Sequence, residues 1–238
     1  CALPALFARS HSVPEPTAPE QVRGLKVYAL GPLRVERDGT AIERWGGDKA
    51  GTYQAEALFA FLFDRRGRGL TKDEASEVVW PDLDLEKADM AFHRTISGLR
   101  RTLEPGLRRG NESTMVTYHH ERYWLNPAVV GWCDVEAFGA AIERGHTQAR
   151  QGDFETARAS FVQAMSLYRG EYLDDCPFFG DSSYVEPRRN ELRDQQRDTL
   201  VALGSVYEQL GQVGEAASCY RKALAASDGD CPRAEEGL

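Results

Sequence analysis

The sequence predicts an α+β N-terminal winged helix-turn-helix domain over residues 22–127, followed by an all-α, tetratricopeptide-like helical domain over residues 128–238. Three observations support this fold class. Short β-favouring runs come first and are followed by three amphipathic helical stretches and a hairpin pattern. The pattern from residue 134 onward is helical almost throughout. Within it, a segment of 14 residues recurs 59 residues later, which is typical of helical repeat proteins.

Residues 1–21 are predicted to form a linker, because three prolines fall between Pro14 and Pro19 and favour an extended backbone. A small antiparallel sheet is expected next, from β-favouring runs at 25–30, 33–36 and 41–45. The turn before the third run contains Asp-Gly, a dipeptide that favours tight hairpin turns. The folded part of the chain is therefore expected to begin near Val22.

Three helices are predicted after the sheet. The first covers Tyr53–Arg65, where apolar residues recur at i, i+3, i+4 and i+7. The second begins at Thr71, where Thr-Lys-Asp-Glu matches a capping box, and it ends before Pro81. The third covers Leu85–Leu103, whose apolar residues recur at spacings of three and four.

A β-hairpin is predicted after the third helix, with strands at 114–117 and 123–125 and its tip near His119 and His120. Helices followed by a hairpin are the layout of a winged helix, with the hairpin as the wing. Arg122 is predicted to contact a DNA groove or phosphate, and either histidine could do the same. The alternative is that these are only polar turn residues. A metal site is not expected there, because adjacent strand residues point to opposite faces.

The repeated segment predicts paired helices in the second domain. Gly152–Met165 and Gly211–Leu224 share the frame G-x4-A-x3-[FY]-x2-A-[ML]. This frame is the second-helix signature of a tetratricopeptide repeat, in which small alanines let helices approach and an aromatic ring fills the gap. Because the offset exceeds one repeat, an insertion around 176–181 and a long helix over 185–210 are expected between the copies.

Composition limits the classes of function. The 238 residues carry a net charge of −8, yet residues 1–127 hold 18 basic and 18 acidic residues. The longest apolar run, Ala57–Phe63, is too short to span a membrane, and the first residues do not resemble a secretory signal. A cytoplasmic protein with no membrane partner is therefore expected. The five cysteines form no C-x-x-C pair and are expected to be reduced. A chain that begins with Cys1 is expected to be a piece of a longer protein.

The third predicted helix carries the candidate DNA-binding surface. Opposite its apolar stripe lie Lys87, Met90, Arg94 and Arg101, with Ser97 and Gly98 beside them. The arginines can address guanine edges or phosphates, and a glycine lets the helix approach closely. Residues 90–110 hold five arginines and one acid, a net charge of +4 on one element. The candidate DNA-binding set also includes Thr71 and Lys72, at the start of the second helix. The alternative is a solvated helix face with ordinary surface arginines.

Catalytic patterns are not found. The segment Gly46–Thr52 lacks the residue order of a phosphate-binding P-loop and is better explained as a turn between sheet and helix. The sequence shows no nucleophile elbow, no paired catalytic carboxylates and no nucleotide fingerprint. We therefore expect no enzymatic activity, no cofactor and no metal.

Six segments together resemble a known family. They are Leu25–Val35, Leu70–Pro81, Phe92–Pro105, Tyr123–Leu125, Asp134–Phe138 and Leu167–Leu173. These segments closely resemble the SARP-type bacterial transcriptional regulators, over about residues 22–238. The resemblance implies an OmpR/PhoB-like winged helix fused to a bacterial transcriptional activator domain. It also implies an activator that binds direct repeats near promoters and recruits RNA polymerase.

In that family the third helix enters the major groove and the wing touches the minor groove. The loop before the third helix faces polymerase, and here it carries Asp82 and Asp84. The alternative for these acids is a simple helix cap. A homodimer or a head-to-tail assembly on double-stranded DNA is the expected arrangement. Relatives of this pattern also form the output end of larger signalling ATPases, which would account for the start at Cys1.

Two departures from the family pattern affect these expectations. Many relatives have Gly-Tyr in the second wing strand, where this chain has Arg122-Tyr123, and relatives continue with another helical repeat beyond residues 228–238. Two other classes of function also remain open. One is a protein-interaction scaffold with weak or no DNA binding, which the neutral first domain favours. The other is a ligand sensor using Arg189, Arg193 and Arg197, for which a salt-bridged helix face is the alternative.

Overall fold

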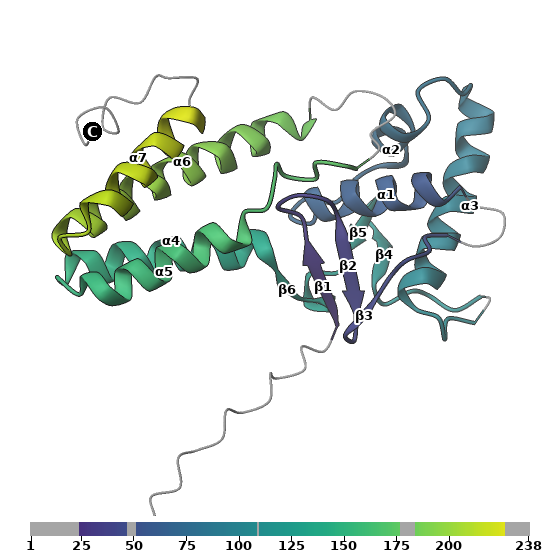
Figure 1. Cartoon of the computed structure of the whole chain (residues 1–238). Helices are drawn as coiled ribbons and strands as arrows, with labels where there is room; N and C mark the ends of the chain where they lie inside the picture. Colours follow the sequence, from purple (N-terminus) through teal and green to yellow (C-terminus); the bar gives the residue numbers. More distant parts are fainter. Residues whose placement is uncertain (1–23, 47–50, 109, 177–183, 227–238) are drawn as a thin grey trace, which may run out of the picture.

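The computed structural model describes residues 24–46, 51–108, 110–176 and 184–226. The predicted linker at 1–21, the C-terminal residues 227–238 and Arg109 lie outside the described residues. The predicted fold class is confirmed: a small sheet and a winged helix-turn-helix precede a helical domain (Figure 1). Across the described residues, no helix is both long enough and apolar enough to cross a membrane.

A four-stranded sheet begins the described chain. The strands β1 (Leu25–Tyr28), β2 (Arg34–Arg37) and β3 (Thr40–Ala41) pair antiparallel in sequence order. The residues between β2 and β3 are Asp38-Gly39, both at positive φ, as expected for a tight Asp-Gly turn. No sequence pattern predicted β6 (Val130–Cys133), which lies parallel to β1 and gives the order β3-β2-β1-β6. The first sheet therefore includes residues beyond 127. The division of the chain into two domains at residue 127 stays a prediction.

Three helices follow the sheet: α1 (Thr52–Asp64), α2 (Lys72–Val79) and α3 (Leu85–Leu103). The predicted capping box at the start of α2 is confirmed. The Thr71 hydroxyl accepts from the Glu74 N–H at 3.1 Å, and the Glu74 carboxylate accepts from the Thr71 N–H at 2.7 Å. This reciprocal pair satisfies two N–H groups that have no partner inside the helix.

The wing is the hairpin of β4 (Val116–His119) and β5 (Arg122–Leu125). It turns at His120 and Glu121, both of which have positive φ, as a two-residue turn between twisted strands requires. The backbone of Tyr123 exchanges two hydrogen bonds, at 2.8 and 2.9 Å, with that of Leu70, just before α2. The wing is therefore attached to the helix-turn-helix through backbone hydrogen bonds.

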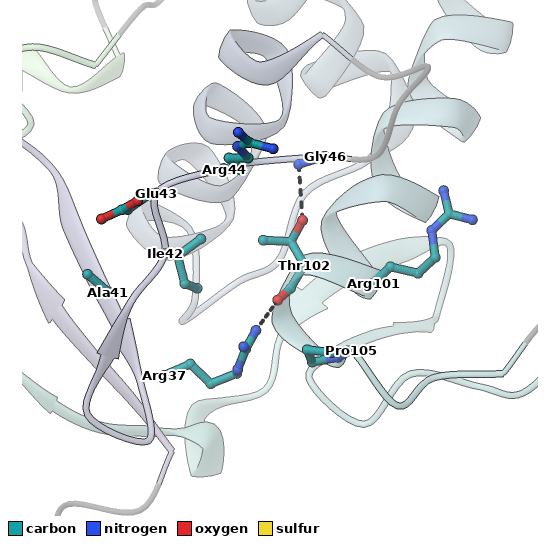
Figure 2. A pocket seen from close by; sticks show the side chains of 9 residues that line it. All are labelled: Arg37, Ala41, Ile42, Glu43, Arg44, Gly46, Arg101, Thr102 and Pro105. Carbon is teal, nitrogen blue, oxygen red and sulfur yellow. Dashed lines mark hydrogen bonds between the residues drawn. The ribbon is translucent and has the colours of Figure 1, made fainter.

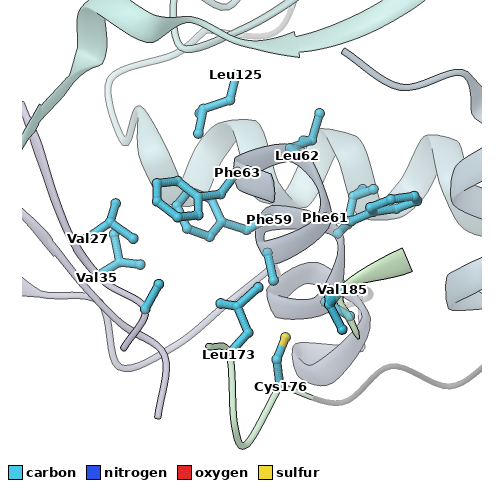
Figure 3. Close-up of a cluster of buried hydrophobic side chains, with 14 of the residues drawn as sticks. Val27, Val35, Phe59, Phe61, Leu62, Phe63, Leu125, Leu173, Cys176 and Val185 are labelled. Atoms are coloured by element: carbon cyan, nitrogen blue, oxygen red, sulfur yellow. The ribbon is translucent and has the colours of Figure 1, made fainter. Parts of the chain in front are cut away.

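Helix α1 lies at the centre of the main core. Figure 3 shows Phe59 and Phe63 pointing toward Val27 and Val35 of the sheet. On another side of α1, the ring of Phe61 packs against that of Tyr184 in the helical domain. The centroids of the two rings are 4.2 Å apart. The sequence predicts one apolar stripe for this helix, whereas the residues 57–63 are all buried. The difference arises because the sheet, α3 and the helical domain cover α1 from several sides.

The helical domain contains two helix pairs. The first is α4 (Asp134–Arg150) with α5 (Phe154–Leu167), and the second is α6 (Glu186–Gln209) with α7 (Val213–Ala226). Figure 1 shows each pair as two adjacent antiparallel helices. The helices α5 and α7 coincide with the repeated segment, so the predicted helix pairing is confirmed.

The repeat extends to glycines that the sequence frame did not include. A Cβ atom on Gly145 of α4 would lie 2.6 Å from the ring of Phe161, and one on Gly204 of α6 would lie 2.6 Å from the ring of Tyr220. In each pair the aromatic ring therefore occupies the space of a missing side chain, which allows the two helices to approach closely.

Replacing Gly204 by alanine is expected to destabilise the chain by about 1–3 kcal/mol, because the new methyl group overlaps a buried ring. The measurement is urea unfolding followed by circular dichroism. Gly139→Ala in α4 is the matched control, since a Cβ there meets no atom within 4 Å. That control is expected to be neutral or stabilising by up to about 1 kcal/mol. Equal stability of the two variants would contradict the packing argument.

A buried carboxylate joins the helical domain to the sheet. Asp134, the first residue of α4, is 1% exposed. It accepts hydrogen bonds from the N–H of Ala29 at 2.8 and 3.0 Å and from that of Leu30 at 3.0 Å. Arg169 pairs with the same carboxylate at 3.3 Å. Burial raises the pKa of Asp134, against the lowering effect of these hydrogen bonds and of Arg169. The N–H groups of Ala29 and Leu30, directly after β1, thus obtain their hydrogen-bond acceptor from the first residue of α4.

Candidate nucleic-acid interface

The sequence of α3 fixes which of its faces is free. Asp84 caps the helix by accepting from the N–H of Lys87 at 2.9 Å. The apolar residues at spacings of three and four, among them Phe92, Ile96 and Leu99, are buried against the main core. Because an α-helix repeats every 3.6 residues, the residues between them face solvent.

The structure brings together on the outer face of α3 the residues that the sequence assigned to it. All of the following are exposed: Lys87, Met90, Arg94, Ser97 and Arg101. We call these five residues the α3 outer face. Gly98 is buried, so the expectation that it lies beside them and eases close approach is wrong. The Ser97 hydroxyl donates to the carbonyl of His93 at 2.8 Å.

The two arginines of the α3 outer face are not neutralised. Among the described residues, neither Arg94 nor Arg101 forms an ion pair or donates a hydrogen bond to the protein. Arg100 differs, because its Nε donates to the Val116 carbonyl at 3.0 Å and its guanidinium lies 5.9 Å from the Tyr123 ring. Arg100 therefore joins α3 to the wing, whereas Arg94 and Arg101 keep all their donors available to a ligand.

Arg122, which was predicted to contact a DNA groove or phosphate, has partners within the protein. Its guanidinium donates to the carbonyls of Arg68 at 3.0 Å and Gly69 at 3.2 Å. It also pairs with the Glu74 carboxylate at 2.7 Å. These contacts hold β5 against the turn before α2, so Arg122 positions the wing, and its DNA contact stays a prediction. The sequence could not show this, because the partners are 48 to 54 residues away.

Glu74 links the helix cap to the wing. Partial burial acts to raise its pKa, but the Thr71 N–H and the Arg122 guanidinium outweigh this effect and leave the pKa lowered. A carboxylate whose pKa is lowered by folding stabilises the fold above its ordinary pKa. That contribution is lost as the pH falls through the folded-state value.

Glu74→Ala is expected to lower the free energy of unfolding by about 1 kcal/mol at pH 7, since it removes a helix cap and a half-exposed ion pair. The difference from wild type should shrink as the pH falls below about 4. Urea unfolding at several pH values measures it, with exposed Glu77→Ala on the same helix as control. A difference that is independent of pH would exclude an ionised Glu74 as its origin.

Thr71 and Lys72 also have internal partners. The Thr71 hydroxyl serves the helix cap, and the Lys72 ammonium pairs with Asp89 on α3. This pair raises the pKa of Lys72 and lowers that of Asp89. The partner Asp89 could not be predicted from the sequence, because it lies 17 residues away on another helix. Thr71 therefore stabilises the start of α2, and Lys72 stabilises the contact between α2 and α3. The predicted DNA contact of both residues stays a prediction.

The tip of the wing is exposed. His119 stacks on Trp124, with ring centroids 5.0 Å apart and planes 13° apart. His120 occupies the turn at positive φ. Sequence reasoning did not select Tyr118, which is 57% exposed on β4. No group of three or more potential metal ligands occurs at the wing or elsewhere in the described part of the chain.

The loop before α3 combines acids with exposed apolar residues. Asp82 is exposed, while Asp84 caps α3 and pairs with Lys87 at 2.7 Å. The cap that was the alternative explanation for Asp84 is thus present. Sequence reasoning missed Leu83 and Leu85, which are 40% and 88% exposed. Their exposure could not be told from a periodic pattern, because Leu83 precedes α3 and Leu85 is its first residue.

The three arginines considered for a ligand sensor are all paired. Arg189 donates to the carbonyls of Tyr172 at 2.9 Å and Leu173 at 3.0 Å. Arg193 pairs with Glu171, and Arg197 pairs with two neighbouring aspartates. The alternative of a salt-bridged helix face agrees with this arrangement.

These features define a class: a winged helix with an exposed basic outer face, joined to paired helical repeats. Residues 133–231 match the family model of the bacterial transcriptional activator domain. This match and the relatives described below confirm the resemblance to SARP-type bacterial transcriptional regulators.

Two curated relatives are similar in sequence. Regulatory protein AfsR of Streptomyces coelicolor is 26% identical over 177 residues, which are 74% of this chain and 16% of AfsR. Transcriptional regulatory protein MoaR1 of Mycobacterium tuberculosis is 28% identical over 151 residues, which are 63% of this chain and 46% of MoaR1. This chain thus matches less than half the length of either relative, and both relatives are regulators by name.

A solved structure shares the fold. Mycobacterium tuberculosis EmbR, in complex with a low affinity phosphopeptide, superposes with a TM-score of 0.61 at 22% sequence identity. The similarity covers 90% of this chain and 64% of that chain. At this level of identity the match establishes the order of winged helix and helical domain, and nothing about ligands.

Proposed function

We propose that the chain is a sequence-specific DNA-binding transcriptional regulator that reads the major groove with α3. The observation that carries the proposal is the pair Arg94 and Arg101, which are exposed on the α3 outer face and have no acidic partner among the described residues. Arginine donates two parallel hydrogen bonds to guanine or binds phosphate, and a helix of this kind fits the major groove. In this proposal the chain acts by binding double-stranded DNA in the cytoplasm. It catalyses no reaction and uses neither a cofactor nor a membrane.

Activation would proceed through RNA polymerase. The loop before α3 presents Asp82 and Asp84 beside the exposed apolar side chains of Leu83 and Leu85. Acidic and apolar groups together suit a basic protein surface with an apolar centre. Direct repeats near promoters, bound by a homodimer or a head-to-tail assembly, would place this loop beside polymerase. The chain would serve as the output part of a larger signalling protein.

Selection from a randomised duplex pool tests the proposal. The full chain is incubated with the pool at two salt concentrations, and the bound DNA is recovered and sequenced. Enrichment of a repeated half-site, bound more weakly at high salt, is the expected result. Binding without enrichment of any sequence would exclude a sequence-specific regulator.

A protein-interaction scaffold is the second candidate function. It is favoured by the balance of 18 basic and 18 acidic residues over 1–127 and by the exposure of Leu85. The same selection separates the two functions, because a scaffold would show neither enrichment nor salt-dependent DNA binding.

A further inference from the structure

A basic hollow lies at the C-terminal end of α3, beyond the α3 outer face. Its volume is about 330 Å³, and it lies between the end of α3 and the segment that follows β3 (Figure 2). Three arginines line it from separate elements: Arg37 at the end of β2, Arg44 after β3 and Arg101 on α3.

Two hydrogen bonds fix the hollow. The Gly46 N–H donates to the Thr102 hydroxyl at 3.0 Å, which holds the segment after β3 against α3. The Arg37 guanidinium donates to the Thr102 carbonyl, one of the carbonyls at the end of α3 that lack a helical partner. This contact places a positive charge at the negative end of the helix dipole. A guanidinium has five N–H groups, so Arg37 retains donors beyond this bond.

The charge of the hollow is not compensated. No ion pair within the described residues involves Arg37, Arg44 or Arg101. Among the described residues that line it, Glu43 alone is acidic, and Figure 2 shows its carboxylate pointing away from Thr102. Arginines elsewhere in the chain, such as Arg66 and Arg158, pair with carboxylates. Three arginines that line one opening and form no ion pair among the described residues favour an oxyanion as ligand.

We propose that this hollow binds a backbone phosphate of the DNA, next to the groove that α3 reads. The proposal rests on the proposed function and adds Arg37 and Arg44 to the interface. Arg101 connects the two surfaces, because it belongs to both the α3 outer face and the hollow. A phosphate bound here would fix the register of α3 on the duplex without adding base specificity. A free phosphate compound would offer the same chemistry, and the test separates the two sources.

The test compares Arg44→Ala with wild type on the selected duplex. The variant is expected to bind about three- to tenfold more weakly, with the slope of log affinity against log salt reduced by about 1. Base preference should be unchanged. Arg150→Ala is the matched control, since that exposed arginine ends α4, away from α3 in Figure 1. Its DNA affinity and salt slope should equal those of wild type.

Duplexes with single neutral methylphosphonates locate the contact. A methylphosphonate at one such position should weaken DNA binding by wild type but not by Arg44→Ala. If Arg44→Ala and wild type had equal affinity and salt slope while Arg94→Ala lost affinity, the phosphate site in the hollow would be overturned. The proposed function would then still stand. Absence of DNA binding by wild type would overturn both. Calorimetric binding of inorganic phosphate that Arg44→Ala abolishes, with DNA affinity unchanged, would assign the hollow to a free phosphate compound and overturn the DNA proposal.

Discussion

The double substitution Arg94→Ala and Arg101→Ala is expected to lower affinity for the selected duplex by about two to four orders of magnitude, at about 1–3 kcal/mol for each bidentate arginine contact. Both side chains are exposed and have no protein partner among the described residues, so their loss should leave the fold intact. Fluorescence anisotropy at two salt concentrations measures the affinity. Circular dichroism and urea unfolding check that stability is unchanged.

Single variants separate the contributions of the two arginines. Arg94→Ala is expected to relax base preference at one position of the half-site, as loss of a base contact does. Arg144→Ala on α4 serves as the control, because its guanidinium donates only to Gln163 at 3.0 Å, within the helical domain. If the double variant bound the duplex as tightly as Arg144→Ala, the α3 outer face would not be the DNA-reading surface.

Asp134→Ala should have the largest effect on stability, a loss of about 3–5 kcal/mol. The buried carboxylate satisfies the N–H groups of Ala29 and Leu30, and its removal leaves both donors without their acceptor. It also leaves Arg169 without its partner at the junction. Urea unfolding at pH 7, followed by tryptophan fluorescence, measures the loss.

An exposed ion pair across the same junction provides the control. Glu136 lies two residues further along α4 and pairs with Arg66 of the winged helix at 2.8 Å, with its side chain 64% exposed. Glu136→Ala is expected to cost less than about 1 kcal/mol, because solvent screens exposed pairs. Similar losses for Asp134→Ala and Glu136→Ala would show that the buried hydrogen bonds do not hold the domains together.

Local patterns were sufficient to predict much of the fold. The bounds of α3 agree with the predicted Leu85–Leu103, and the capping box at Thr71 forms as its four residues indicate. Both depend on neighbours within one or two helical turns. The α3 outer face followed from the same periodicity, since burying Phe92 and Leu99 leaves Arg94 and Arg101 on the other side.

Features that depend on distant residues were not predictable. The four residues of β6 give no clear strand pattern and become a strand by pairing with β1, about a hundred residues away. Arg122 was predicted to contact DNA, but in the fold its guanidinium binds the Glu74 carboxylate and two backbone carbonyls. The basic hollow likewise forms only when folding brings Arg37, Arg44 and Arg101, from three parts of the chain, to line one opening.

The sequence by itself determined the order of the elements apart from β6, the free face of α3 and the repeated helix pairs. Each of these follows from side-chain periodicity or local capping, which act over a few residues. Only the tertiary structure decided which charged groups are available to a ligand. Arg122 and Lys72 pair with acidic residues in the fold, whereas Arg94 and Arg101 have no such partner in the part of the chain that the structure describes. Pairing differs because it depends on contacts between elements far apart in the chain.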